Sequence, residues 1–232
     1  MRLLLPLLIL GLVTLNGCYY DTIRGEDDHA LFAEGEVVVG LGKEERTDPK
    51  RRVNTLSAGY IRTAGVSDQT LDYYDDIAVN GEDISGPVTL ENDLKLSVGY
   101  LRFVRHMFVT QSFAWHWGAG LGYSHLNYTG TTPYQQVNFI DSATGLHGQA
   151  GVAYRFNPLV TLEGALGGYI FSGDYDSRLL TAQLGLAMFP VERLRLFAGY
   201  RRWEYYLSSD TYGMSDIDFL FAGPTVGASL TF

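Results

Sequence analysis

The sequence predicts an all-β protein, in which antiparallel strands run up and down around a barrel that spans a membrane. Three observations predict it. Large apolar residues alternate with small or polar ones along most of the chain, aromatic residues collect near the ends of the alternating segments, and short connections follow long ones. Alternation with a period of two is the pattern of a strand with two different faces. No helical periodicity appears after residue 34.

The clearest alternation lies in residues 180–188, where large apolar side chains occupy one face and Thr181, Gln183 and Gly185 the other. Residues 94–100, 113–123 and 160–170 repeat the pattern. Small residues suit the crowded interior of a narrow barrel. We therefore expect the small and polar face to point inward and the large apolar face, including Leu94, Leu96, Val98 and Tyr100, to point toward lipid.

The connections also differ in length in the way that a membrane barrel predicts. Residues 155–158 and 189–192 have the composition of tight turns, whereas residues 126–142 and 208–215 are longer and rich in Tyr, Thr, Asp and Gly. Short turns on one side of the membrane and long loops on the other are typical of such barrels.

The last alternating segment, residues 216–232, carries the most specific signal. Val226, Leu230 and the terminal Phe232 share its apolar face. This ending resembles the C-terminal signature of bacterial outer-membrane barrels, and the resemblance covers residues 35–232 at the level of the class. It implies outer-membrane lipid, lipopolysaccharide and the barrel assembly machinery as partners. A monomer with both chain ends in the periplasm is the corresponding expectation.

The number of strands follows from counting back from Phe232. Residues 35–91 have room for three strands beyond those of residues 92–232, the third over residues 71–79. Outer-membrane barrels of one chain use even strand numbers, so ten strands are expected. The alternative is eight, with residues 65–91 as one acidic loop and residues 35–42 outside the ring. The seven segments after residue 91 are about 92–103, 108–125, 143–156, 159–171, 177–189, 192–207 and 216–232.

The N-terminus has the pattern of an export signal. Arg2 precedes an apolar stretch, residues 3–15, that is too short for a comfortable membrane span. It ends in Leu15-Asn16-Gly17-Cys18, which resembles the lipobox of bacterial lipoprotein precursors. The resemblance implies a signal peptide over residues 1–17, a lipidated Cys18 and a periplasmic tether over residues 18–34. Ordinary signal-peptide cleavage nearby is the alternative.

Composition excludes some functions. The net charge of −9 argues against nucleic acid, because binding phosphates needs a basic surface. Cys18 is the only cysteine, so no internal disulfide is expected.

The inward face of the predicted barrel carries polar and charged residues. We interpret them as an ion-pair and hydrogen-bond network that plugs the lumen, because charges inside a barrel can pair or meet water. A narrow channel for small solutes is one alternative, and a lipid-modifying or proteolytic enzyme is another. No catalytic, metal or cofactor spacing is found around His125 or the acidic residues 72–83. The predicted lumen residues are Lys95, His116, His147, Gln149, Arg155, Glu163, Gln183 and Arg195, and Arg201 is a further candidate.

Overall fold

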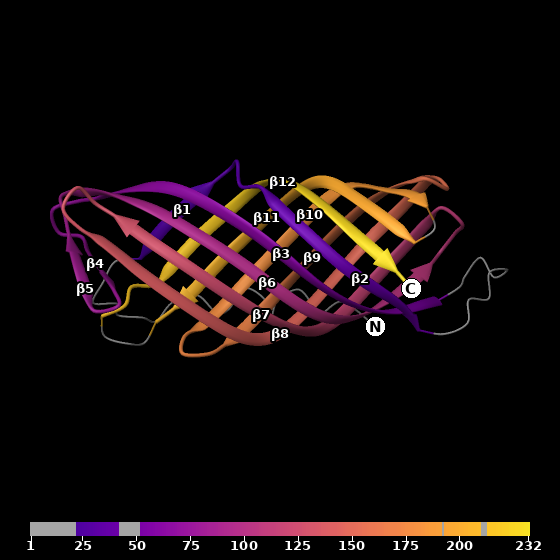
Figure 1. Ribbon diagram of the computed structural model, residues 1–232, viewed down its shortest axis with the longest axis horizontal. Coiled ribbons are helices and arrows are strands. Elements are labelled where there is room, and N and C mark those ends of the chain that lie inside the picture. The colour runs from indigo at the N-terminus through magenta and orange to yellow at the C-terminus, as the bar shows by residue number, and fades with distance from the viewer. Residues whose placement is uncertain (1–21, 42–51, 192, 210–212) are drawn as a thin grey trace, which may run out of the picture.

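The computed structural model describes residues 22–41, 52–191, 193–209 and 213–232. This part of the chain is all-β (Figure 1). Its strands are β1 Ile23–Asp27, β2 Phe32–Leu41, β3 Arg52–Leu71, β4 Asp76–Val79, β5 Glu82–Ser85, β6 Val88–Phe108, β7 Phe113–Thr131, β8 Gln136–Asn157, β9 Val160–Ser172, β10 Asp176–Val191, β11 Leu194–Ser208 and β12 Ile217–Thr231.

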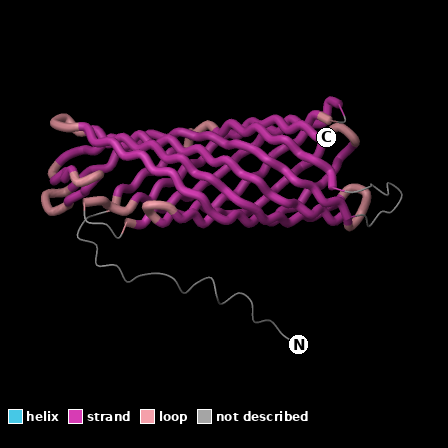
Figure 2. Tube along the Cα trace, turned by 60° about the horizontal axis from the view of Figure 1, so that its bottom comes forward, coloured by secondary structure: helices cyan, strands magenta, loops and turns pink. Residues whose placement is uncertain are grey.

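One large sheet curls into a barrel-like ring (Figures 1 and 2). It contains ten strands in the order β1-β12-β11-β10-β9-β8-β7-β6-β3-β2, and a β12–β2 pairing closes it. Neighbouring strands are antiparallel except at the closure, where β1 and β2 both pair in parallel with β12. Since β1 and β2 share one edge of β12, nine of the ten strands complete the ring.

The ten-stranded sheet is not built from the expected strands, and nine of its strands complete the ring, whereas ten were expected to do so. Residues 71–79 do not form a strand of the ring, and β1 together with the start of β2 comes from residues that we expected to form a tether. The alternative of eight strands also placed residues 35–42 outside the ring, whereas Gly35–Leu41 pair with β3. The sequence does not reveal the parallel closure, because alternation is the same in parallel and antiparallel strands.

The two ends of the ring differ. The β4–β5 hairpin lies at one end, which we call the hairpin end, and Phe232 lies at the other, which we call the C-terminal end (Figure 1). Ile23 pairs with Ile217 at the start of β12, while Val38 pairs with Thr231 at its finish. The first described residues and the C-terminus therefore lie at opposite ends of the ring.

Several strands are longer than the sequence pattern predicts. β7 and β8 continue through residues 126–142, which we expected to form a loop, and leave only residues 132–135 between them. β3, β6 and β8 have 20, 21 and 22 residues, about twice the 9–11 that cross a bilayer. These three strands are therefore long enough to extend beyond a bilayer.

The β4–β5 hairpin covers the hairpin end. Asn80 and Gly81 have φ values of 53° and 80°, the conformation of a tight hairpin turn with the Asn-Gly sequence. The hairpin is attached to the β11–β12 connection, since Gly81 N–H donates to Gly213 C=O (2.8 Å) and Ser215 N–H to Ala78 C=O (2.7 Å). Ile77, Val79 and Ile84 are buried in the core that lies beneath it.

The interior changes character along the ring. In the half next to the hairpin, the inward side chains form a hydrophobic core, with Leu94, Leu96 and Val98 fully buried. The expectation that these residues face lipid is wrong: they point inward, and Lys95 points outward. In the other half, the inward side chains are polar and the large apolar ones lie outside. The outward apolar residues include Leu121, Leu146, Leu166, Leu184, Val226 and Leu230.

Candidate functional site

Three ion pairs cross the interior of the C-terminal half of the ring. Glu34 Oε2 of β2 lies 2.6 Å from Arg201 Nη2 of β11, and Glu36 Oε1 of β2 lies 2.5 Å from Arg102 Nη2 of β6. The third pair joins Glu163 of β9 to Arg195 of β11. Each pair links two strands that have one strand between them in the ring, so the network ties next-nearest strands together.

Arg102 is the centre of the first part of the network. Its guanidinium donates to Glu36, to Ser57 Oγ (3.0 Å) and to Gln149 Oε1 (2.7 Å), and it lies 4.3 Å from the centre of the Tyr100 ring. The Tyr100 hydroxyl donates to Glu34 Oε1 (2.8 Å), which connects this part with Arg201. A Cβ at Gly59 would lie 2.3 Å from that hydroxyl, so the glycine makes room for it.

Arg201 lies deeper, and 2% of it is exposed. Its Nη2 donates to Glu34 and to Gln183, but its Nε and Nη1 are buried without a partner among the described residues. They adjoin a cavity of about 20 Å³, which has room for one water molecule. Phe32 and Trp203 lie on the side toward the hydrophobic core and form an edge-to-face pair with ring centres 5.2 Å apart.

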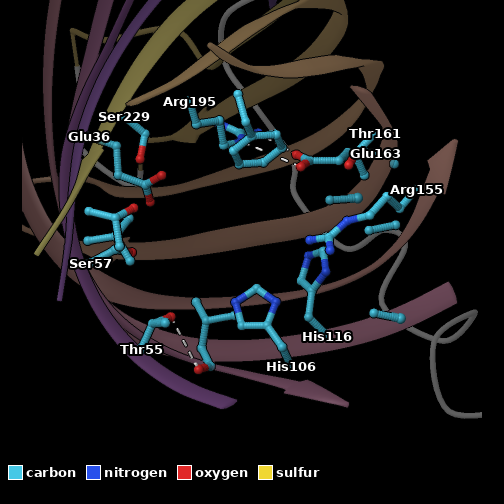
Figure 3. A pocket seen from close by; sticks show the side chains of 18 of the residues that line it. Glu36, Thr55, Ser57, His106, His116, Arg155, Thr161, Glu163, Arg195 and Ser229 are labelled. Carbon is cyan, nitrogen blue, oxygen red and sulfur yellow. Dashed lines mark hydrogen bonds and ion pairs between the residues drawn. The ribbon is translucent and has the colours of Figure 1, made fainter. Parts of the chain in front are cut away.

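A larger cavity of about 260 Å³ lies between this network and the C-terminal end. We call it the chamber. Gln111, Ser112 and Phe189 line it near the short connections of that end. Its walls carry charged and imidazole side chains from β2, β6, β7, β8, β9 and β11 (Figure 3).

His106 and His116 are directly paired across β6 and β7, with ring centres 5.4 Å apart. A Cβ at Gly151 of β8 would lie 2.6 Å from the His116 ring, so a small residue again makes room for a large polar one. The side chain of Arg155 lies beside His116, while Glu163 extends from β9, the strand next to β8, and pairs with Arg195 of β11 (Figure 3).

The structure places most of the predicted lumen residues inside. His116, Gln149, Arg155, Glu163, Gln183 and Arg195 line the chamber, and His147 lines the small cavity next to it. Lys95 is different, because its side chain points outward in the hairpin half and pairs with Asp93 (2.8 Å). The prediction that Lys95 lies in the lumen is wrong because, in this half of the ring, the apolar face points inward and the polar face points outward.

The remaining predicted residues lie elsewhere. Val226, Leu230 and Phe232 point outward, and Phe232 N–H donates to Val38 C=O (2.9 Å). His125 also points outward, with Nδ1 2.9 Å from Ser142 Oγ. Cys18 and the signal peptide lie outside the described residues.

Sequence reasoning missed five members of the network: Glu34, Glu36, Tyr100, Arg102 and His106. Glu34 is the last residue of the expected tether and Glu36 lies at the start of the expected barrel, and their alternation with Ala33, Gly35 and Val37 already has the period of a strand. Arg102 shares its face with Leu94, eight residues earlier, so the change from apolar to polar along one face was the signal for it.

The described part of the chain contains no group of three or more His, Cys, Asp or Glu residues that could hold a metal ion. It also contains no helix long and apolar enough to cross a membrane. Comparison with protein families, with characterised proteins and with solved structures finds no match.

Proposed function

We propose that the protein is an integral β-barrel of the bacterial outer membrane, with a plugged lumen and a structural or surface-interaction role. The observation that carries the proposal is the exchange of polarity along the ring. Where the inside is charged the outside is apolar apart from Arg105 near the C-terminal end of β6, and where the inside is an apolar core the outside is polar. The first arrangement suits a barrel in lipid, and the second suits a barrel in water.

The outer surface of β7 illustrates the apolar part. Its outward residues from Phe113 to Tyr123 are Phe, Trp, Trp, Ala, Leu and Tyr, and the following ones are His125, Asn127 and Thr129. Ten residue steps of about 3.3 Å at a tilt of about 40° span about 25 Å, the height of the lipid-facing band of outer-membrane barrels. Aromatic residues stand at both edges of this band, as is typical of the membrane interface.

The band continues around the ring without outward charges on β9. Its outward residues are Val160, Leu162, Gly164, Leu166, Gly168 and Ile170. A charge at such a position would cost a few kcal/mol in lipid, whereas in water it would be favourable. On β11, outward charges begin only at Arg202, which pairs with Glu204 (2.8 Å) nearer the hairpin end.

A plugged lumen follows from the two interior halves together. A solute entering at the C-terminal end meets the Arg102 and Arg201 networks and then the apolar core around Phe32 and Trp203. This favours a structural or surface role over the alternative of a narrow channel. Planar-bilayer recordings should give no discrete conductance steps, and reproducible steps would support the channel instead.

The same proposal includes an orientation. The C-terminal signature of Val226, Leu230 and Phe232 places that end of the ring in the periplasm by resemblance, so the hairpin end faces outward. Ile23 lies at the hairpin end, but the residues before Thr22 lie outside the described part of the chain, so the expectation of a periplasmic N-terminus stays a prediction. The surface that this orientation presents outward carries Tyr73, Tyr74 and Tyr134, which are 73%, 89% and 90% exposed.

The test is membrane extraction of the full protein and of a Cys18→Ser variant. We expect both to stay in the membrane after carbonate washing and to migrate differently on gels with and without heating, as folded outer-membrane barrels do. Release of the wild type by carbonate, or release of the variant alone, would show that the ring itself is not embedded.

A further inference from the structure

The chamber has more hydrogen-bond donors than acceptors. Its lining and the adjoining small cavity carry four arginines and three glutamates, and each glutamate pairs with one arginine. Among the described residues, one positive charge, that of Arg155, therefore remains without a carboxylate.

Arg155 extends from β8 into the chamber near the C-terminal end. Its backbone N–H donates to Ser112 C=O (2.7 Å), whereas its guanidinium has no partner among the described residues. The rings of His106 and His116 likewise line the chamber without a hydrogen bond to another described residue. Arg155 and His116 lie side by side at the wall, so their donors converge on the same space (Figure 3).

The inner wall adds a second, independent observation. Arg201 is nearly fully buried, and its Nε and Nη1 have no partner in the described part of the chain, although burying an unpaired donor of a charged group is costly. The small cavity beside it shares Arg102, Gln149 and Gln183 with the chamber. Unpaired hydrogen-bond donors thus occur both near the C-terminal end, at Arg155, and next to the apolar core, at Arg201.

We propose that the chamber binds a small oxyanion, a carboxylate or a phosphate, through Arg155, with His116 beside it. Arginine matches the planar or tetrahedral oxygens of such groups, and the described carboxylates of the chamber are already paired and so do not repel one. The volume of about 260 Å³ is below that of most sites for drug-sized ligands, which limits the ligand to a few heavy atoms. The apolar core closes the far side, so the ligand enters and leaves at the C-terminal end. This inference does not depend on the membrane location.

The experiment is a titration of the purified full-length protein with inorganic phosphate and, separately, with succinate, followed by calorimetry at constant ionic strength. The Arg155→Gln variant removes the proposed contact. Arg62→Gln is the matched control, because Arg62 makes the same change of charge on the outer surface of the hairpin half.

We expect saturable binding of at least one of the two anions, a loss of affinity of about tenfold or more in Arg155→Gln, and wild-type affinity in Arg62→Gln. Competition between the probes would show whether carboxylate and phosphate share the site. The inference is overturned if neither anion binds saturably, or if the two variants bind equally well. A thermal unfolding scan of each variant shows whether it is folded, and His116→Ala offers a second test of the same contact region.

Discussion

The proposed lipid-facing band predicts that one substitution has opposite consequences in the two halves of the ring. Leu166 points outward in the middle of β9 and is 68% exposed, while Ile140 points outward on β8 in the hairpin half and is 63% exposed. The two side chains are thus matched in size, exposure and strand environment. Under the proposal they differ in what surrounds them, which is lipid for Leu166 and water for Ile140.

Replacing Leu166 by arginine should lower the free energy of unfolding by about 2–4 kcal/mol, the cost of arginine near the middle of a bilayer. Replacing Ile140 by arginine should change it by less than about 0.5 kcal/mol, as surface substitutions in water usually do. Because neither side chain is buried in protein, loss of internal packing contributes little to either value.

The assay is reversible guanidinium unfolding of each protein folded into phospholipid vesicles, followed by tryptophan fluorescence. The wild type and both variants are compared at the same lipid ratio. Equal effects of the two substitutions would refute the reasoning, because they would mean that both side chains face the same solvent.

Three further substitutions probe the interior. Glu163→Gln and Arg195→Met should each lower the free energy of unfolding by about 3 kcal/mol, because each leaves the other charge buried without its partner. The double variant should recover much of that loss. Additive losses in a double-mutant cycle of unfolding would contradict this reasoning. In the hairpin half, burial raises the pKa of Asp141 above its usual 3.8, and its Oδ2 has no partner among the described residues. The folded state then holds the proton more tightly, so stability should fall as pH rises from 3.8 through the raised pKa. Asp141→Asn should remove that slope and stabilise the protein by about 1 kcal/mol at pH 7, and a slope that persists in thermal melts of the variant would show that another group causes it.

The strands could be predicted from the sequence because alternation depends only on neighbouring residues. Leu180, Leu184 and Met188 indeed face outward on β10, as their pattern predicts. Alternation does not reveal which face is inside, and this is why Leu94 and Lys95 were assigned to the wrong faces. The assumption that the larger apolar face points outward holds in the C-terminal half of the ring and is wrong in the hairpin half.

The parts that failed depend on contacts between distant segments. Residues 71–79 alternate weakly, and Asn80-Gly81 turns the chain back before a long strand can form. Glu34 is recognisable as a lumen residue only when Arg201, 167 positions away, is known to face it. The candidate site was therefore predicted in its later half, from His116 onward, and missed where β2 and β6 complete it.

The most direct test of the account is a scan of single cysteines along the outer face of β7, in a Cys18→Ser background, with a fluorescent label and two quenchers. One quencher is carried by lipid chains and the other is dissolved in water. The account predicts that labels at Trp117, Ala119 and Leu121 are quenched from the lipid and that labels at Asn127 and Thr129 are quenched from the water, with the change near His125. Water quenching at all five positions, or lipid quenching at all five, would contradict it.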